Sequence, residues 1–259
     1  LANKAIEYLT WYLSLDNSQF FVSSREFEYH IALLNEELKL MEKYKSKLSD
    51  NYSGKLDELY GMYVSRMKGA RYKAMFIEQP PWIFRALYPK AIFRMSPDEK
   101  AVYLTFDDGP IPEVTPWVLE LLDKYDIKAT FFMVGDNIRK YPDIFRMVVE
   151  RGHRIGNHTF NHIRGFEYSA DEYLKNTDLA NREMKTDLFR PPHGHMGFKQ
   201  YHTLKQHYDI IMWDLVTRDY SKKRRPEQVL ANVKRYVRNG SIITFHDSLK
   251  SWNNGNLQY

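Results

Sequence analysis

The sequence predicts an α/β fold in which parallel strands alternate with helices. From residue 101 onward, short runs rich in β-branched and aromatic residues recur, and the stretches between them carry a helical pattern of apolar residues. The 259 residues are 43% hydrophobic and 27% charged, which is enough to bury a large core. Parallel sheets place functional loops at the carboxyl ends of their strands, so polar residues directly after each run are candidates for a site.

Six runs are predicted strands, each ending in or followed by a turn or a polar residue. They cover residues 101–106, 128–134, 153–158, 187–192, 208–213 and 241–246. Apolar residues at three- and four-residue spacing predict helices in the connecting segments, for example at 116–125 and 226–240.

The chain before residue 101 has a different pattern. Residues 25–74 show two helical apolar stripes separated by "SDNYSG", which predicts a helical hairpin that serves in packing or in a homodimer. Residues 75–100, with "QPPW" and "YPK", predict an irregular lead-in to the first strand.

Composition narrows the chemistry. Cysteine is absent, so any metal must be held by nitrogen and oxygen ligands. The net charge of +5 suits an anionic surface, but the basic residues are scattered and form no recognised reader motif, so we predict no nucleic-acid partner. No apolar run approaches the ~20 residues of a membrane-spanning helix. The compartment stays open: cell envelope or extracellular if an upstream signal was removed, otherwise cytoplasmic.

Paired acids and paired histidines follow two of the predicted strands. Asp107 and Asp108 lie in "TFDDGP", and His158 and His162 lie in "HTFNH". A helical turn would stack the two imidazoles on one face, and with Asp108 they form a two-histidine, one-carboxylate set with open coordination positions. The second carboxylate would then accept a proton from the metal-activated water.

Two further strand ends carry candidate residues. In "FRPPHG", Arg190 precedes a Pro-Pro pair that includes Pro192 and fixes the backbone, so the His193 amide could point at a developing oxyanion. In "ITFHD", His246 follows a buried strand and is the side chain best suited to deliver a proton near neutral pH.

In this order, the motifs TFDDG, HTxxH, RPPxG, a W-to-D segment and a hydrophobic-HD pair resemble the polysaccharide deacetylases, the NodB homology domains of carbohydrate esterase family four. The resemblance covers residues 101–248. It implies a distorted (β/α) barrel of about seven units that removes acetyl groups from N-acetylated sugars, usually with zinc and sometimes with cobalt or nickel.

The resemblance also implies a role for each matching residue. Asp107 would be the general base, and Asp108, His158 and His162 would be the metal ligands. His246 would be the general acid, Arg190 would orient Asp107, and the His193 amide would hold the oxyanion.

The fourth motif departs from the family pattern. "WDLVTRDY" puts Val216 where many members have an aspartate that helps to set the catalytic arginine and histidine. Asp219 matches the second aspartate of the motif and Asp214 lies near, so either could compensate. His193 stands where many members have tyrosine, which would alter substrate fit more than chemistry.

The ends of the chain predict an unusual order of domains. Family members continue past the HD motif with a helix and a closing strand, and here residues 1–24 contain a helix, a turn and a strand. We predict a circular permutation in which residues 1–24 close the barrel, followed by the hairpin at 25–74 and the catalytic domain at 75–259. The alternative is that the first segment joins the hairpin as a three-helix accessory domain.

The leading functional prediction is a metal-dependent hydrolase that removes N-acetyl groups from N-acetylglucosamine units of peptidoglycan or a chitin-like glycan. Trp213, Tyr220 and Phe106 are candidates for stacking on sugar rings, or for the core. One alternative is an O-acetyl esterase acting on acetylated xylan or a similar polysaccharide. A second, from another class, is a non-catalytic glycan-binding or scaffold protein.

Overall fold

The computed structural model describes residues 78–80, 85, 88–194 and 196–259. Residues 1–24 and 25–74 lie outside these ranges, so the permutation, the hairpin, the accessory domain and the dimer stay predictions.

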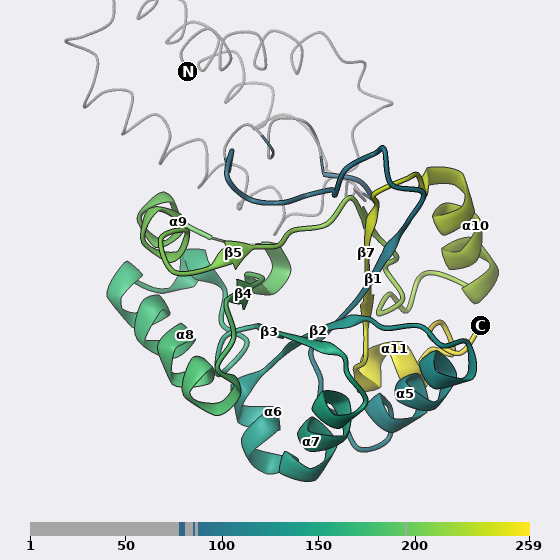
Figure 1. The fold of residues 1–259 in the computed structure, drawn as a ribbon, viewed down its shortest axis with the longest axis horizontal. Coiled ribbons are helices and arrows are strands. Elements are labelled where there is room, and N and C mark those ends of the chain that lie inside the picture. The colour runs from purple at the N-terminus through teal and green to yellow at the C-terminus, as the bar shows by residue number, and fades with distance from the viewer. Residues whose placement is uncertain (1–77, 81–84, 86–87, 195) are drawn as a thin grey trace, which may run out of the picture. The chain divides into compact units, whose positions relative to one another are not determined.

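Seven strands form one sheet in which every pairing is parallel. Its order is β5-β4-β3-β2-β1-β7-β6, so the five-residue strands β1 and β7 lie side by side, with only β6 beyond β7 (Figure 1). The strands are β1 (Tyr103–Asp107), β2 (Thr130–Met133), β3 (Arg154–Asn157), β4 (Leu188–Phe189), β5 (Asp209–Ile210), β6 (Leu215–Val216) and β7 (Ile242–His246).

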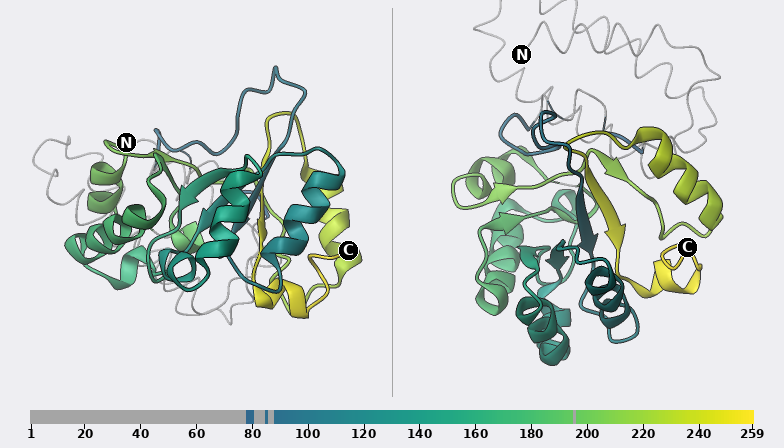
Figure 2. Two further views of the ribbon diagram at one scale, coloured as in Figure 1. Left: turned by 60° about the horizontal axis from the view of Figure 1, so that its bottom comes forward. Right: turned by 45° about the vertical axis from the view of Figure 1, so that its right-hand side comes forward.

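Helices surround the outer side of the curled sheet, as the three views show (Figures 1 and 2). They are α5 (Thr115–Lys124), α6 (Gly135–Lys140), α7 (Pro142–Glu150), α8 (Ala170–Met184), α9 (Phe198–Leu204), α10 (Pro226–Tyr236) and α11 (Leu249–Asn253), with short 3₁₀ turns η3 (Gly165–Glu167) and η4 (Pro192–Gly194). α5 and α10 confirm the two helices predicted at 116–125 and 226–240.

The predicted α/β class and the distorted barrel are confirmed, and all six predicted strands are present. β6 was not predicted, because Leu215 and Val216 follow the predicted strand at 208–213 almost directly, with no helix or turn signal to mark a separate strand. From residue 88 to residue 100 the lead-in is irregular. It forms isolated bridges from Ile92 to Ile211, beside β5, and from Arg94 to Ser241, beside β7. One short segment reaches two strands that are not neighbours because the sheet is curled into an open half-barrel.

The core between the central strands and helices α5 to α8 contains stacked aromatic rings among aliphatic side chains. Phe131 of β2 is fully buried and stacks on Phe106 of β1 with ring centroids 5.1 Å apart. Val118, Leu119 and Leu122 bury one face of α5 against the same cluster. This packing, together with the parallel pairing, fixes the register in which the strand ends meet.

Replacing Phe131 with alanine is expected to lower the free energy of unfolding by about 3–5 kcal/mol, because it removes a buried ring and leaves a cavity in the core. Urea denaturation followed by circular dichroism measures the change. Leu121→Ala is the matched control, since Leu121 is exposed on α5. That variant is expected to change stability by less than about 0.5 kcal/mol, and an equal loss in both variants would contradict this account of the core.

Within the part of the chain that the structure describes, no helix has the length and apolar character needed to span a bilayer.

Candidate active site

The candidate residues lie at the carboxyl edge of the sheet, where backbone pairing continues past the strand ends. Adjacent strands are therefore still hydrogen-bonded to each other at the site. The strand order β4-β3-β2-β1-β7 places motifs that are distant in the sequence at the carboxyl ends of neighbouring strands. The bonds run from the amides of Asp108, His158, Arg190 and Asp247 to the carbonyls of Phe132 (3.3 Å), Met133 (3.0 Å), Asn157 (2.9 Å) and Asp107 (3.1 Å) respectively.

Asp108, His158 and His162 form a cluster in which one ligand atom of each lies within 4.8 Å of the others. The Asp108 Oδ1 oxygen is 3.1 Å from His162 Nε2 and 3.8 Å from His158 Nε2. The His158 side chain is 2% exposed, whereas those of Asp108 and His162 are 25% and 31% exposed. One oxygen and two nitrogens with an open side fit a divalent cation such as zinc that keeps a position for water.

The surroundings of these side chains set their orientation and protonation. His158 Nδ1 donates to the Arg190 carbonyl at 2.8 Å, which leaves Nε2 with its lone pair toward Asp108. Burial lowers the pKa of His158 to about 4, so its imidazole is neutral at pH 7. Removal from water would raise the pKa of Asp108, but the hydrogen bond with His162 and the nearby imidazoles hold its pKa well below the usual value.

The segment carrying the two histidines is not helical, so the helical turn considered from the sequence is wrong. Thr159 and His162 instead adopt left-handed φ angles of 62° and 53°. Two asparagine side chains stabilise this turn. The Asn157 Oδ1 oxygen accepts from the Thr159 amide. The Asn176 Oδ1 oxygen accepts from the amides of Phe160 and Asn161. The turn still brings the imidazole centroids to 5.1 Å.

Asp107 and Arg190 form a buried ion pair beside this cluster. Arg190 Nη1 donates to Asp107 Oδ1 at 2.6 Å and to the Thr105 hydroxyl at 2.8 Å. The rest of the guanidinium donates to the carbonyls of Ile211 (3.1 Å) and Met212 (2.9 Å). Arg190 is thus held without the aspartate that Val216 replaces, because two backbone carbonyls and a hydroxyl accept three of its N–H groups beside the one bonded to Asp107.

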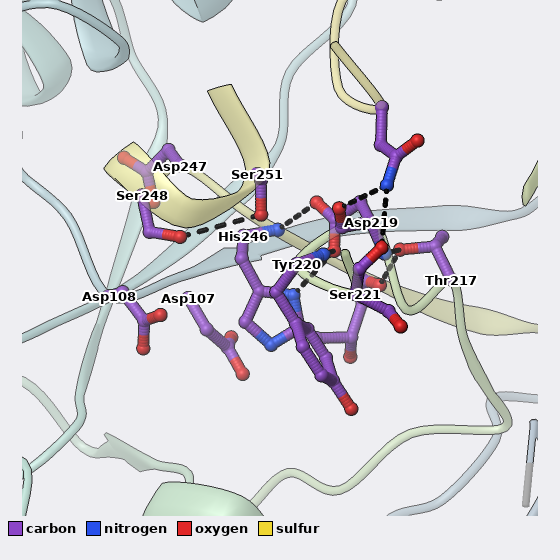
Figure 3. Close-up of polar contacts among 12 residues, drawn as sticks. Asp107, Asp108, Thr217, Asp219, Tyr220, Ser221, His246, Asp247, Ser248 and Ser251 are labelled. Atoms are coloured by element: carbon purple, nitrogen blue, oxygen red, sulfur yellow. Dashed lines mark hydrogen bonds and ion pairs between the residues drawn. The ribbon is translucent and has the colours of Figure 1, made fainter. Parts of the chain in front are cut away.

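His246 lies on the other side of Asp107 and is held by Asp219 (Figure 3). The two oxygens of Asp219 accept from the His246 backbone amide at 2.7 Å and from Nδ1 at 2.8 Å. Burial alone would lower the pKa of His246, but the Asp219 carboxylate, helped by Asp108 and Asp107, raises it to about 9. The imidazole is therefore cationic at neutral pH.

Asp214, the other aspartate considered as a substitute in the fourth motif, has a different role. Its carboxylate accepts from Arg85 at 2.7 Å, from Arg238 at 2.6 and 3.0 Å, and from the Ser241 hydroxyl at 2.8 Å. These bonds tie the lead-in and the segment after α10 to the sheet, and Asp219 is the aspartate bonded to His246.

The remaining predicted residues surround the site to different degrees. His193 has a left-handed φ of 59°, and its ring centroid is 4.8 Å from that of His162. Pro192 is buried beside it. Tyr220 is 39% exposed, and its ring stands edge-on to His246 with centroids 4.7 Å apart.

Two of the aromatic residues considered for stacking on sugar rings, Phe106 and Trp213, pack against other parts of the domain. Phe106 is buried in the core against Phe131 and Phe245, so it is not available to a sugar ring. Trp213 is partly buried and packs so closely on Gly194 that a Cβ there would come within 2.6 Å of the indole. The absence of a side chain at Gly194 is what lets the indole support the Pro-Pro turn.

Sequence reasoning gave no role to Asp247, although the HD pair contains it. Its buried carboxyl accepts from the Gly109 amide at 3.1 Å and from the Thr115 hydroxyl at 2.6 Å. Burial raises the pKa of Asp247 to about 8, with Asp108 adding to the rise and the two hydrogen bonds opposing it. An aspartate directly after a strand-end histidine was the only signal in the sequence.

Comparison with known proteins agrees with this geometry. The family profile for polysaccharide deacetylase matches residues 94–207. A peptidoglycan-N-acetylglucosamine deacetylase of Bacillus cereus is 36% identical over 159 residues, which cover 58% of this chain and 74% of the relative. A chitooligosaccharide deacetylase of Azorhizobium caulinodans is 32% identical over 162 residues, or 60% of this chain and 77% of the relative.

A similar solved structure is that of a CE4 family pseudoenzyme from Bacillus anthracis. It superposes with a TM-score of 0.59 at 28% identity, over 65% of this chain and 62% of that one. The parallel half-barrel, the strand-end cluster and these relatives define a hydrolase fold of the glycan deacetylase class. The chain belongs to the polysaccharide deacetylase family.

Proposed function

We propose that the protein is a metal-dependent deacetylase that hydrolyses the N-acetyl groups of N-acetylglucosamine units in a glycan such as peptidoglycan or a chitin-like polymer. The observation that carries this proposal is the separation of tasks at one sheet edge. Three candidate ligand residues face one another, a buried carboxylate lies beside them, and an imidazole bonded to Asp219 lies on the far side of that carboxylate. The named substrates of the two curated relatives support the choice of glycan.

Asp108, His158 and His162 would hold the cation, which we propose to be zinc, with cobalt or nickel able to substitute. When bound, such an ion supplies Lewis acidity that activates water and polarises the acetyl carbonyl. Asp107 would accept the proton of the attacking water, because Arg190 fixes its Oδ1 oxygen and keeps it oriented.

His246 would donate a proton to the departing amine. Asp219 accepts a hydrogen bond from Nδ1–H and so leaves Nε2–H as the donor, and the raised pKa of His246 keeps the Nε2 proton in place at neutral pH. The His193 amide would donate to the developing oxyanion. The close approach of the His193 and His162 rings supports this role, since it puts residue 193 next to a proposed ligand.

The cationic imidazole favours amide over ester hydrolysis. An amine leaves only when it is protonated, whereas an alkoxide is a better leaving group and depends less on His246. The O-acetyl esterase is therefore the second candidate. The pseudoenzyme among the similar structures keeps the non-catalytic reading as a third, although a binding protein has no need of a base held by a buried arginine.

Treatment with a chelator is expected to abolish acetate release from N-acetylated chitooligosaccharides and peptidoglycan fragments, and zinc, cobalt or nickel to restore it, because the ligand set supplies the only cation site that we assign to the reaction. Enzymatic assay of acetate measures both steps, with acetylated xylan as the ester substrate. Magnesium is the matched control, since it prefers six oxygen ligands and would restore little.

The three candidate functions give different results in this assay. Release from xylan alone would favour the esterase. Glycan binding without acetate release from any substrate would favour the non-catalytic protein. Full activity in the chelator would contradict metal dependence.

A further inference from the structure

Asp247 occupies a buried position between the loop after β1 and the start of α5. Both oxygens of its carboxyl are used, one by the Gly109 amide and one by the Thr115 hydroxyl. Thr115 in turn accepts from the Ile111 amide at 2.8 Å, and the Asp247 amide donates to the Asp107 carbonyl. Asp247 is thus bonded to the residues immediately before and after Asp108, namely Asp107 and Gly109.

The loop needs such support because Asp108 has an unfavourable backbone conformation. Its φ angle is 87°, which a residue with a Cβ rarely adopts and which persists only where the surroundings enforce it. Three hydrogen bonds act on the two peptide groups that flank Asp108: its amide donates to the Phe132 carbonyl, its carbonyl accepts from Asn137 Nδ2, and the Gly109 amide donates to Asp247. The third is the bond made by a fully buried acid.

Gly109 is what allows the carboxyl to come so close. A Cβ at this position would lie 2.1 Å from the Asp247 Oδ2 oxygen, so any other residue would push the two segments apart. The hydrogen bond from the Gly109 amide to the Asp247 carboxyl therefore requires glycine at position 109.

We infer that Asp247 is a positioning residue that holds Asp108 in its strained conformation, so that the Asp108 carboxylate faces His158 and His162. This inference rests on the proposed metal site and extends it to the residue that shapes its oxygen ligand. Asp247 touches neither the ligands' donor atoms nor the proposed base side chain in any bond described above. Its effect is exerted through the backbone of residues 107–109.

The test measures metal affinity on the full chain, without turnover. The apoprotein is titrated with zinc against a chromophoric chelator, and with cobalt while the visible absorption spectrum is recorded. Asp247→Ala is expected to weaken zinc binding by about 10–100-fold, the usual cost of losing a residue that orients a ligand. It is also expected to change the cobalt spectrum, because the geometry of the oxygen ligand changes.

Thr115 supplies a second pair of variants in case Asp247→Ala does not fold. Thr115→Val removes the hydroxyl bonded to Asp247 and is expected to weaken zinc binding by about 5-fold, whereas Thr115→Ser keeps the hydroxyl and is expected to rescue the affinity. Leu122→Ala, on the same helix but packed in the core, controls for lost stability. It is expected to lower the melting temperature and leave zinc affinity and the cobalt spectrum unchanged.

Wild-type zinc affinity in Asp247→Ala, or in Thr115→Val if the first variant is unfolded, would overturn the inference. Equal losses in Leu122→Ala would overturn it too, since they would show a general effect of stability. If the wild type binds zinc but releases no acetate, the proposed function fails and the inference is still decided by the affinities. If the wild type binds neither ion, both fail.

Discussion

Replacing Asp107 with asparagine is expected to lower kcat for acetate release by about 10³–10⁴-fold while zinc still binds, because a neutral amide cannot accept the proton of the attacking water. The Asp107 carboxylate is buried, and its Oδ1 oxygen is held by Arg190 at 2.6 Å. Steady-state kinetics on a chitooligosaccharide, together with zinc titration of the apoprotein, separates the two properties.

Two comparisons make this experiment decisive. Asp143→Asn removes an equivalent charge from an exposed site on α7 and is expected to keep normal kinetics. Normal turnover in Asp107→Asn would remove the proposed base. Loss of zinc binding in that variant would mean that Asp107 acts as a ligand, which contradicts the division of tasks between the paired aspartates.

Asp219→Asn is expected to lower kcat by about 10²–10³-fold and to move the alkaline limb of the pH profile toward lower pH. The pKa of His246 is about 9 because Asp219 stabilises the imidazolium against the effect of burial. A raised pKa means that the proton is held through neutral pH and lost as the pH rises through about 9. Without the carboxylate charge that loss occurs at lower pH, so the general acid is missing over more of the range.

The measurement is kcat against pH between about 6 and 10, a range that includes the ordinary histidine pKa and the raised one. Asp214→Asn is the control, since Asp214 is equally buried in the same motif but pairs with Arg85 and Arg238. It is expected to lower the melting temperature and leave the alkaline limb in place. An unchanged limb in Asp219→Asn would contradict the assignment of His246 as the acid that Asp219 controls.

Much of the fold could be predicted because the central strands are long and buried. β1 and β7 have five residues each and are flanked by polar turns, so their type and their ends were clear from the pattern. β6 was missed because it begins two residues after the predicted strand at 208–213, with no turn signal between the two. The curl of the sheet came from family resemblance, since the strand pattern of a chain does not specify curvature.

The candidate metal ligands could be predicted from the sequence because their side-chain chemistry is specific. The residues that hold these side chains in place could not. Asp108, His158 and His162 were grouped from the sequence, and the structure places them together. The left-handed turn that brings the histidines together depends on Asn157 and Asn176, which are 19 positions apart, so local spacing could not reveal it. Two of the acceptors that replace the missing aspartate beside Arg190 are backbone carbonyls, which no side-chain motif can encode, and the third is the Thr105 hydroxyl.

The backbone and the side chain of Arg190 bond to two different residues of the site. Its carbonyl accepts from His158, a proposed ligand, while its guanidinium holds Asp107, the proposed base. A shift of this strand end would therefore displace the imidazole of the proposed ligand His158 and the carboxylate of the proposed base Asp107 together. Damage here could not be repaired by supplying more ion.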